Sequence, residues 1–149
     1  MTRLLIFLLL AGITCSYALL RGGRPERWGA TSCLIAFVAT FLVHQTIVDL
    51  YSRTAIMLFM IDLGLLVAFL TLAARAARYW PIWCAALQLV SVTAHIVRWV
   101  DEEMFHLGYA VLLAAPIYPI LLLLSLGTWR HQQRLKHGQI DPDWRQSFR

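Results

Sequence analysis

The chain has 149 residues, of which 60% are hydrophobic and only 14% are charged. A soluble globular domain carries about 25% charged residues, so this composition excludes an ordinary soluble domain. A net charge of +5 would raise the question of nucleic-acid binding in a soluble protein. Here membrane topology explains the basic residues, and we expect no nucleic-acid partner.

Five apolar runs of roughly 17–23 residues fill most of the chain, and this is the length an α-helix needs to cross a hydrocarbon core of about 30 Å. Because backbone in lipid must be hydrogen-bonded internally, only helices or closed barrels can span a membrane, and these runs lack the alternation of barrel strands. The sequence therefore predicts an all-α polytopic membrane protein with one domain, a bundle of five transmembrane helices and a basic tail at residues 130–149. The predicted helices are Leu4–Leu20, Ala30–Leu50, Thr54–Ala74, Trp80–Val100 and Leu107–Trp129.

The predicted connections are short. Glycines and a proline in Arg21–Arg27 indicate a tight turn between the first two helices. A very short loop around Tyr51–Arg53 makes the second and third helices an antiparallel hairpin. Pro116 and Pro119 are expected to kink the fifth helix near its middle, and a polar helix should continue to about Lys136.

Charge predicts the orientation, because Lys and Arg are enriched in cytoplasmic loops. Ten of the thirteen basic residues fall in the first loop, the third loop and the tail, which five crossings place on one side. We therefore expect the N-terminus outside and the C-terminus in the cytoplasm, with an uncleaved first helix rather than a signal peptide. Aromatic residues at the expected inner interface agree with this orientation: Trp28, Tyr79, Trp80, Trp83 and Trp129.

The fourth helix carries a polar face. Its members are spaced alternately three and four residues apart, which places them on one side of a helix: Gln88, Ser91, His95, Arg98 and Glu102. Polar side chains within a span face protein or water, because a charge in lipid costs about 2.5–3.5 kcal/mol or more. Two interpretations stay open, a helix-packing face and a cavity, ligand site or proton path.

Two histidines lie at similar depth on different helices. His44 and His95 are both predicted to be roughly 7–9 Å below the outer end of their helices. Such a pair could hold a b-type haem through axial nitrogens, with Thr40 and Ser91 as hydrogen-bond acceptors, or contribute to a metal site. The alternative, which we favour, is that both histidines are closely packed and hydrogen-bonded. His106 could add a ligand at the outer surface.

Asp62 is the acid predicted to lie deepest, about 12 Å from the outer end of the third helix. An isolated carboxylate there is costly, so we expect it to be neutral, paired or hydrated. His95, His44 and the stem of Arg98 are the candidate partners.

Three cysteines lie at similar depth near the inner side: Cys15, Cys33 and Cys84. Their depth permits a three-thiol site, but without a Cys-x-x-Cys pair we interpret them as small apolar filler. In the tail, Arg130, Arg134 and Lys136 could bind anionic lipid headgroups at about 1 kcal/mol per cation.

The sequence carries no catalytic motif, and the leading hypothesis is a non-enzymatic integral membrane protein of a bacterial inner membrane. It would act as an accessory or interaction subunit, associating with other membrane subunits or with itself, and would need no cofactor. The first alternative is an electron-transfer subunit with haem b between His44 and His95. The second is a proton- or ion-coupled carrier that uses Asp62, His95, Arg98 and Glu102.

Overall fold

The computed structural model describes residues 2–46, 51–100, 112–138, 143 and 144. Over these residues the fold is all-helical, with no strand and one isolated antiparallel bridge between Ala76 and Trp144. The helices are α1 (Thr2–Arg21), α2 (Arg24–Thr46), α3 (Tyr51–Arg75), α4 (Trp80–Val100) and α6 (Ile117–Lys136).

Within the part of the chain that the structure describes, four helices are long and apolar enough to cross a membrane. The corresponding segments are Arg24–Gln45, Thr54–Arg75, Trp80–Trp99 and Leu112–Lys136, and Leu5–Arg21 is a shorter apolar helix. The all-α class is thus confirmed over the described residues and fits an integral membrane protein. The number of crossings and the N-out orientation stay predictions.

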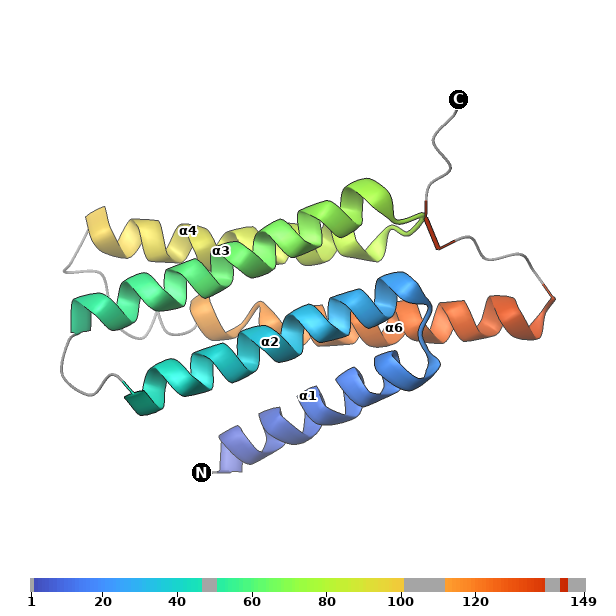
Figure 1. The fold of residues 1–149 in the computed structure, drawn as a ribbon, viewed down its shortest axis with the longest axis horizontal. Coiled ribbons are helices and arrows are strands. Elements are labelled where there is room, and N and C mark those ends of the chain that lie inside the picture. The colour runs from blue at the N-terminus through green and yellow to red at the C-terminus, as the bar shows by residue number, and fades with distance from the viewer. Residues whose placement is uncertain (1, 47–50, 101–111, 139–142, 145–149) are drawn as a thin grey trace.

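The helices pack side by side as a closed bundle. In turn, α1 packs on α2, α2 on α3, α3 on α4, α4 on α6 and α6 back on α1, with a smaller contact between α2 and α6. The turn from α1 to α2, the turn from α3 to α4 and the C-terminal end of α6 lie at the same end of the bundle (Figure 1). We call this the basic end, comprising residues 21–27, 75–80, 130–138 and 143–144.

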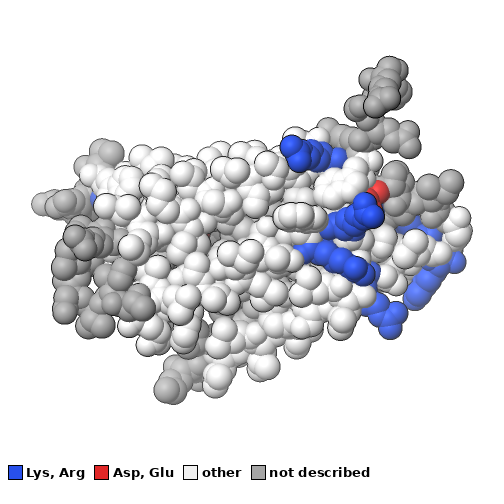
Figure 2. Space-filling model, viewed as in Figure 1, with Lys and Arg blue, Asp and Glu red and all other residues white. Residues whose placement is uncertain are grey.

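Basic side chains gather at that end. Figure 2 shows them over the α1–α2 turn, the α3–α4 turn and the end of α6, beside a largely uncharged helical surface. This grouping agrees with the three basic segments recognised in the sequence. It places them on one side of the bundle, as the positive-inside argument requires, without fixing which side is cytoplasmic.

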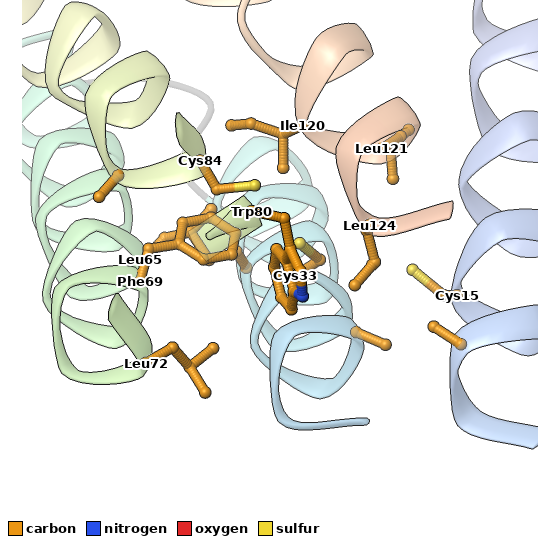
Figure 3. Packing of buried hydrophobic residues seen from close by; sticks show 14 of the residues in the cluster. Cys15, Cys33, Leu65, Phe69, Leu72, Trp80, Cys84, Ile120, Leu121 and Leu124 are labelled. Atoms are coloured by element: carbon orange, nitrogen blue, oxygen red, sulfur yellow. The ribbon is translucent and has the colours of Figure 1, made fainter. Parts of the chain in front are cut away.

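Small side chains allow the helices to approach closely. The buried residues of α1 and α2 are mostly alanine, cysteine and threonine at helical spacing, and larger aliphatic and aromatic side chains of α3, α4 and α6 complete the core (Figure 3). The three cysteines lie in this hydrophobic cluster, one each on α1, α2 and α4. Within the described part of the chain, no group of three His, Cys, Asp or Glu side chains is arranged to hold a metal ion.

Two segments that were predicted as loops contain the first turns of helices. α2 starts at Arg24 rather than at Ala30, so Pro25 lies in its first turn, where the missing N–H costs little. α3 starts at Tyr51, so the predicted loop around Tyr51–Arg53 belongs to a helix. In both places the polar residues that were interpreted as loop are the first turns of helices that extend beyond their apolar segments.

The fifth predicted helix is interrupted rather than kinked. Residues 112–114 are helical, a turn follows, and α6 begins after Pro116. Pro119 falls in the first turn of α6, where its missing N–H is tolerated. Residues 107–111 lie outside the described residues. The predicted polar extension is confirmed, because α6 ends at Lys136 and Gly138 follows with φ 67°.

Candidate functional site

Asp62, Gln88 and His95 form a polar cluster between α3 and α4, which we call the Asp62 cluster. The Gln88 side-chain amide donates to Asp62 Oδ1 at 3.0 Å and to the Asp62 carbonyl oxygen at 3.3 Å. His95 Nε2 lies 3.1 Å from Asp62 Oδ2. The expected contact between Asp62 and His95 is therefore present.

The helix geometry explains this arrangement. Gln88 and His95 are two turns apart on one face of α4, and α3 packs on that face in the antiparallel direction. Asp62, near the middle of α3, reaches both side chains at once. His95 is 2% exposed and its ring meets Phe59 edge-on at 6.0 Å, whereas the Asp62 side chain is 27% exposed. The imidazole is thus fixed while the carboxylate keeps some access to its surroundings.

The rest of the predicted polar face of α4 follows the same side of the helix. Ser91 is buried, and Arg98 is half-buried near the end of α4. Glu102 and His106 lie outside the described residues. Gln88, Ser91 and His95 therefore point into the bundle, as the three-four spacing predicts.

The two histidines do not form a pair. His44 is exposed on α2, whereas His95 is buried on α4 with Nε2 directed at Asp62. α2 packs on α1, α3 and α6, and α4 packs on α3 and α6. The expectation of a closely packed, hydrogen-bonded histidine holds for His95, and the close packing expected of His44 is wrong because its side chain is exposed. The position of a residue along its helix predicts its depth in the membrane. It does not predict whether the side chain faces the bundle or its surroundings.

A second polar cluster, which the sequence did not reveal, lies at the basic end. Glu26, near the start of α2, is completely buried. Its Oε1 accepts from Arg78 Nε at 3.3 Å and from the Trp80 indole N–H at 3.1 Å. Arg78 had been assigned only to a basic loop, yet its side chain is 4% exposed. We call Glu26, Arg78, Trp80 and Asp143 the Glu26 cluster.

Trp80 occupies the space between α2 and α6, where two glycines make room for its ring. A Cβ added to Gly29 would lie 2.7 Å from one end of the indole, and a Cβ added to Gly127 would lie 2.7 Å from the other. Figure 3 shows Trp80 amid the side chains of the surrounding helices. The prediction that Trp80 lies at the lipid interface is wrong, because it is 7% exposed. Trp28, Tyr79, Trp83 and Trp129 are exposed, as expected.

The tail returns to this cluster through Asp143. Its carbonyl accepts from the Ala77 N–H at 3.2 Å, and Oδ1 accepts from the Arg24 N–H at 3.3 Å. Arg78 Nη2 is 3.9 Å from Asp143 Oδ1, and Arg24 Nε is 4.0 Å from Oδ2. Trp144 packs against the hydrophobic cluster. For the tail the sequence predicts a polar helix to about Lys136, and no pattern in it indicates this contact.

The proposed lipid-binding cations lie on the last turns of α6. Arg130 and Lys136 are exposed and Arg134 is half-buried. Their position on the basic end is compatible with a headgroup region.

Comparison of the chain with family models, with curated proteins and with solved structures gives no match. The fold and composition therefore define only the class of protein, which over the described residues is all-helical with four helices of membrane-spanning length and a shorter apolar one.

The Asp62–His95 contact is expected to be worth about 0.6 to 1.7 kcal/mol, the mean and the maximum found for hydrogen bonds between transmembrane helices by double-mutant cycles. A double-mutant cycle with Asp62→Asn and His95→Phe, followed by SDS-induced unfolding in mixed micelles, measures it. Thr93→Val is the control, because the exposed Thr93 hydroxyl bonds only the Leu89 carbonyl of its own helix. Strict additivity of the two substitutions would contradict the assignment.

Proposed function

We propose that this chain is a non-enzymatic integral membrane protein that serves as an accessory or interaction subunit of a larger membrane assembly. The observation that carries the proposal is that the Asp62 carboxylate makes its contacts inside the bundle, between α3 and α4. Gln88 and His95, which contact the carboxylate, both belong to the neighbouring helix α4, so these polar side chains join two helices. Polar groups between membrane helices most often serve as helix contacts of this kind.

Other polar contacts in the bundle have the same character. Ser125 of α6 donates to Thr14 of α1 at 3.3 Å, and the buried Thr128 hydroxyl bonds the Leu124 carbonyl of its own helix. These groups are used for packing and local hydrogen bonding. The chain also leaves only short segments between its apolar runs, which are too short to build a separate soluble catalytic domain.

The outer surface supports association within a membrane. Every described helix exposes large apolar side chains, for example Leu9 and Ile13 on α1, Phe41 on α2 and Leu122 on α6. Such a surface is costly in water and favourable against lipid or another apolar helix. A bacterial inner membrane, with the basic end in the cytoplasm, is the location and orientation that we propose. A C-terminal reporter active only outside the cytoplasm would contradict this orientation.

The subunit proposal is tested in native membranes. The tagged full-length chain, expressed at its native level and extracted with a mild detergent, is expected to migrate with a stable set of co-purifying membrane proteins after in-membrane cross-linking. Migration as the isolated 17.0 kDa chain, before and after cross-linking, would contradict the proposal. Cross-links formed only between copies of this chain would indicate a homo-oligomer in place of a larger assembly.

Proton-coupled transport is the second candidate, and it is favoured by one observation. The Asp62 carboxylate is partly exposed, with a side-chain exposure of 27%, although it lies near the middle of α3 and contacts a buried imidazole. A carboxyl and an imidazole in hydrogen-bond contact can exchange a proton, and ionisable groups within spans often mark proton paths.

Proteoliposomes with a pH-sensitive dye inside distinguish the two candidates. As a subunit without transport activity, the purified chain should leave the proton leak of the liposomes unchanged. A leak that the chain raises, that Asp62→Asn abolishes and that Thr93→Val leaves intact would establish the carrier and overturn the subunit proposal.

A further inference from the structure

Three titratable side chains from three separate elements meet beside Gly23 at the basic end. The position that a Cβ of Gly23 would occupy lies 2.7 Å from Asp143 Oδ1, 3.0 Å from Glu26 Oε2 and 3.0 Å from His131 Cε1. Glu26 belongs to α2, His131 to α6 and Asp143 to the tail. The absence of a side chain at Gly23 creates the space in which the three groups converge.

One atom in this space lacks a hydrogen bond. Glu26 Oε1 accepts from both Arg78 and Trp80, whereas Glu26 Oε2 is buried and has no hydrogen-bond partner among the described residues. A buried acceptor without a donor costs about 1–3 kcal/mol, and more when the group is charged. The geometry therefore leaves a place for one further donor next to Glu26 Oε2.

His131 is positioned to supply that donor. The imidazole is half-buried on α6, and its Cε1 is the atom nearest Gly23. A half-turn of the ring about its Cβ–Cγ bond exchanges Cε1 with Nε2, and side-chain torsions of this type are broad and roughly two-fold. The same side-chain position then presents an N–H to the space between the two carboxylates.

Two carboxylates that share one arginine face the same space as His131. Glu26 and Asp143 are the acids that share the space beside Gly23. Arg78 is divided between them, because its Nε contacts Glu26 and its Nη2 lies 3.9 Å from Asp143. Arg24 approaches Asp143 only at 4.0 Å, and its side chain is 76% exposed, so solvent screens it. The other cations at this end are exposed or half-buried: Arg21, Arg27, Arg75, Arg130, Arg134 and Lys136.

We propose that protonated His131 bridges Glu26 and Asp143 and thereby latches the C-terminal segment onto the basic end of the bundle. In this arrangement, protonated His131 on α6 contacts Glu26 of α2 and Asp143 of the tail. Arg78, in the α3–α4 turn, lies near both acids. When His131 loses its proton, Arg78 is the buried cation that the two carboxylates still share, and the tail contact weakens. Histidine side chains change charge within the range of about pH 5 to 8, so the latch is closed where His131 is protonated and loosened where it is neutral.

Two backbone amides report the state of the latch directly. The Ala77 N–H and the Arg24 N–H both donate to Asp143, and they belong to different elements. Their hydrogen exchange is measured by mass spectrometry on the full-length protein in detergent, at about pH 5.5 and about pH 8.5, on either side of the ordinary imidazole pKa. Comparing wild type with His131→Gln at the same pH cancels the intrinsic pH dependence of exchange.

At the lower pH, both amides should exchange at least about tenfold faster in His131→Gln than in wild type, which is the lower end of the effect of one charge-assisted hydrogen bond. At the higher pH the two proteins should agree within about twofold. His137→Gln replaces an exposed histidine next to the end of α6, and should match wild type at both pH values. Equal exchange in wild type and His131→Gln at both pH values would overturn the proposal, and would mean that water or another group satisfies Glu26.

Discussion

Replacing Glu26 with alanine is expected to lower the free energy of unfolding by about 3 to 5 kcal/mol, because it removes one partner of a buried ion pair. Arg78 would keep its charge in a site where its side chain is 4% exposed, and the Trp80 indole N–H would lose its acceptor. SDS titration in mixed micelles, followed by circular dichroism, measures the loss.

Two further variants separate the ion pair from its surroundings. Asp143→Asn removes a partly exposed carboxylate that lies 3.9 Å from Arg78, so its cost should stay within about 1 kcal/mol. Replacing both partners, Glu26→Leu with Arg78→Met, should cost less than Glu26→Ala alone, because no uncompensated charge remains. A Glu26→Ala protein as stable as wild type would show that Arg78 is hydrated rather than paired.

The sequence predicted the part of the site that depends on one helix and its immediate neighbour. The three-four spacing of Gln88, Ser91 and His95 fixed a common face of α4. The short segment between the third and fourth apolar runs made α3 an antiparallel neighbour of that face. A costly carboxylate on α3 then had few candidate partners, and the sequence narrowed them to His95, His44 and Arg98, of which His95 makes the contact.

Features that depend on three or more helices were not predictable in this way. His44 has the depth of His95, but its direction depends on how α2 is rotated within the bundle. Pro116 breaks the helix instead of kinking it, because the chain can turn there and restart with Pro119 in the first turn of α6.

The Glu26 cluster was missed for a related reason. Glu26 is the single acid in a segment rich in arginine, Arg21–Arg27, which reads as an ordinary charged turn. The available sequence signal was the position of Glu26, three residues after a pair of glycines. An acidic residue in the first turn of a helix stabilises the start of that helix. Its burial depends on Arg78 and Trp80, more than fifty residues away, and no local pattern connects them.

Trp80 shows the limit of the rule that aromatic residues at the ends of spans lie at the interface. Trp80 and Trp83 both fall in the first turn of α4 and both satisfy the rule, yet Trp83 is 64% exposed whereas Trp80 is buried. The difference lies in Gly29 and Gly127, which belong to two other helices and leave space for one indole ring.

Among substitutions of packed apolar side chains, we therefore expect the largest loss of stability at Trp80. Trp80→Ala should lower the free energy of unfolding by about 3 to 5 kcal/mol, the usual cost of truncating a buried aromatic residue. It would open a cavity between α2, α4 and α6 and deprive Glu26 Oε1 of the indole donor. Trp83→Ala is the matched control, since it removes the same side chain from the same turn, and its effect should stay within about 0.5 kcal/mol.

Trp80→Phe separates packing from hydrogen bonding, because it keeps an aromatic ring between Gly29 and Gly127 but removes the N–H. Its cost should lie between those of wild type and Trp80→Ala. Combined with Glu26→Ala, it should add less than its own cost, because the hydrogen bond is already absent. Unfolding of wild type, Trp80→Phe, Glu26→Ala and the double variant in mixed micelles measures this coupling. Equal losses for Trp80→Ala and Trp83→Ala would contradict the central position of Trp80 and place its ring in the same environment as that of Trp83.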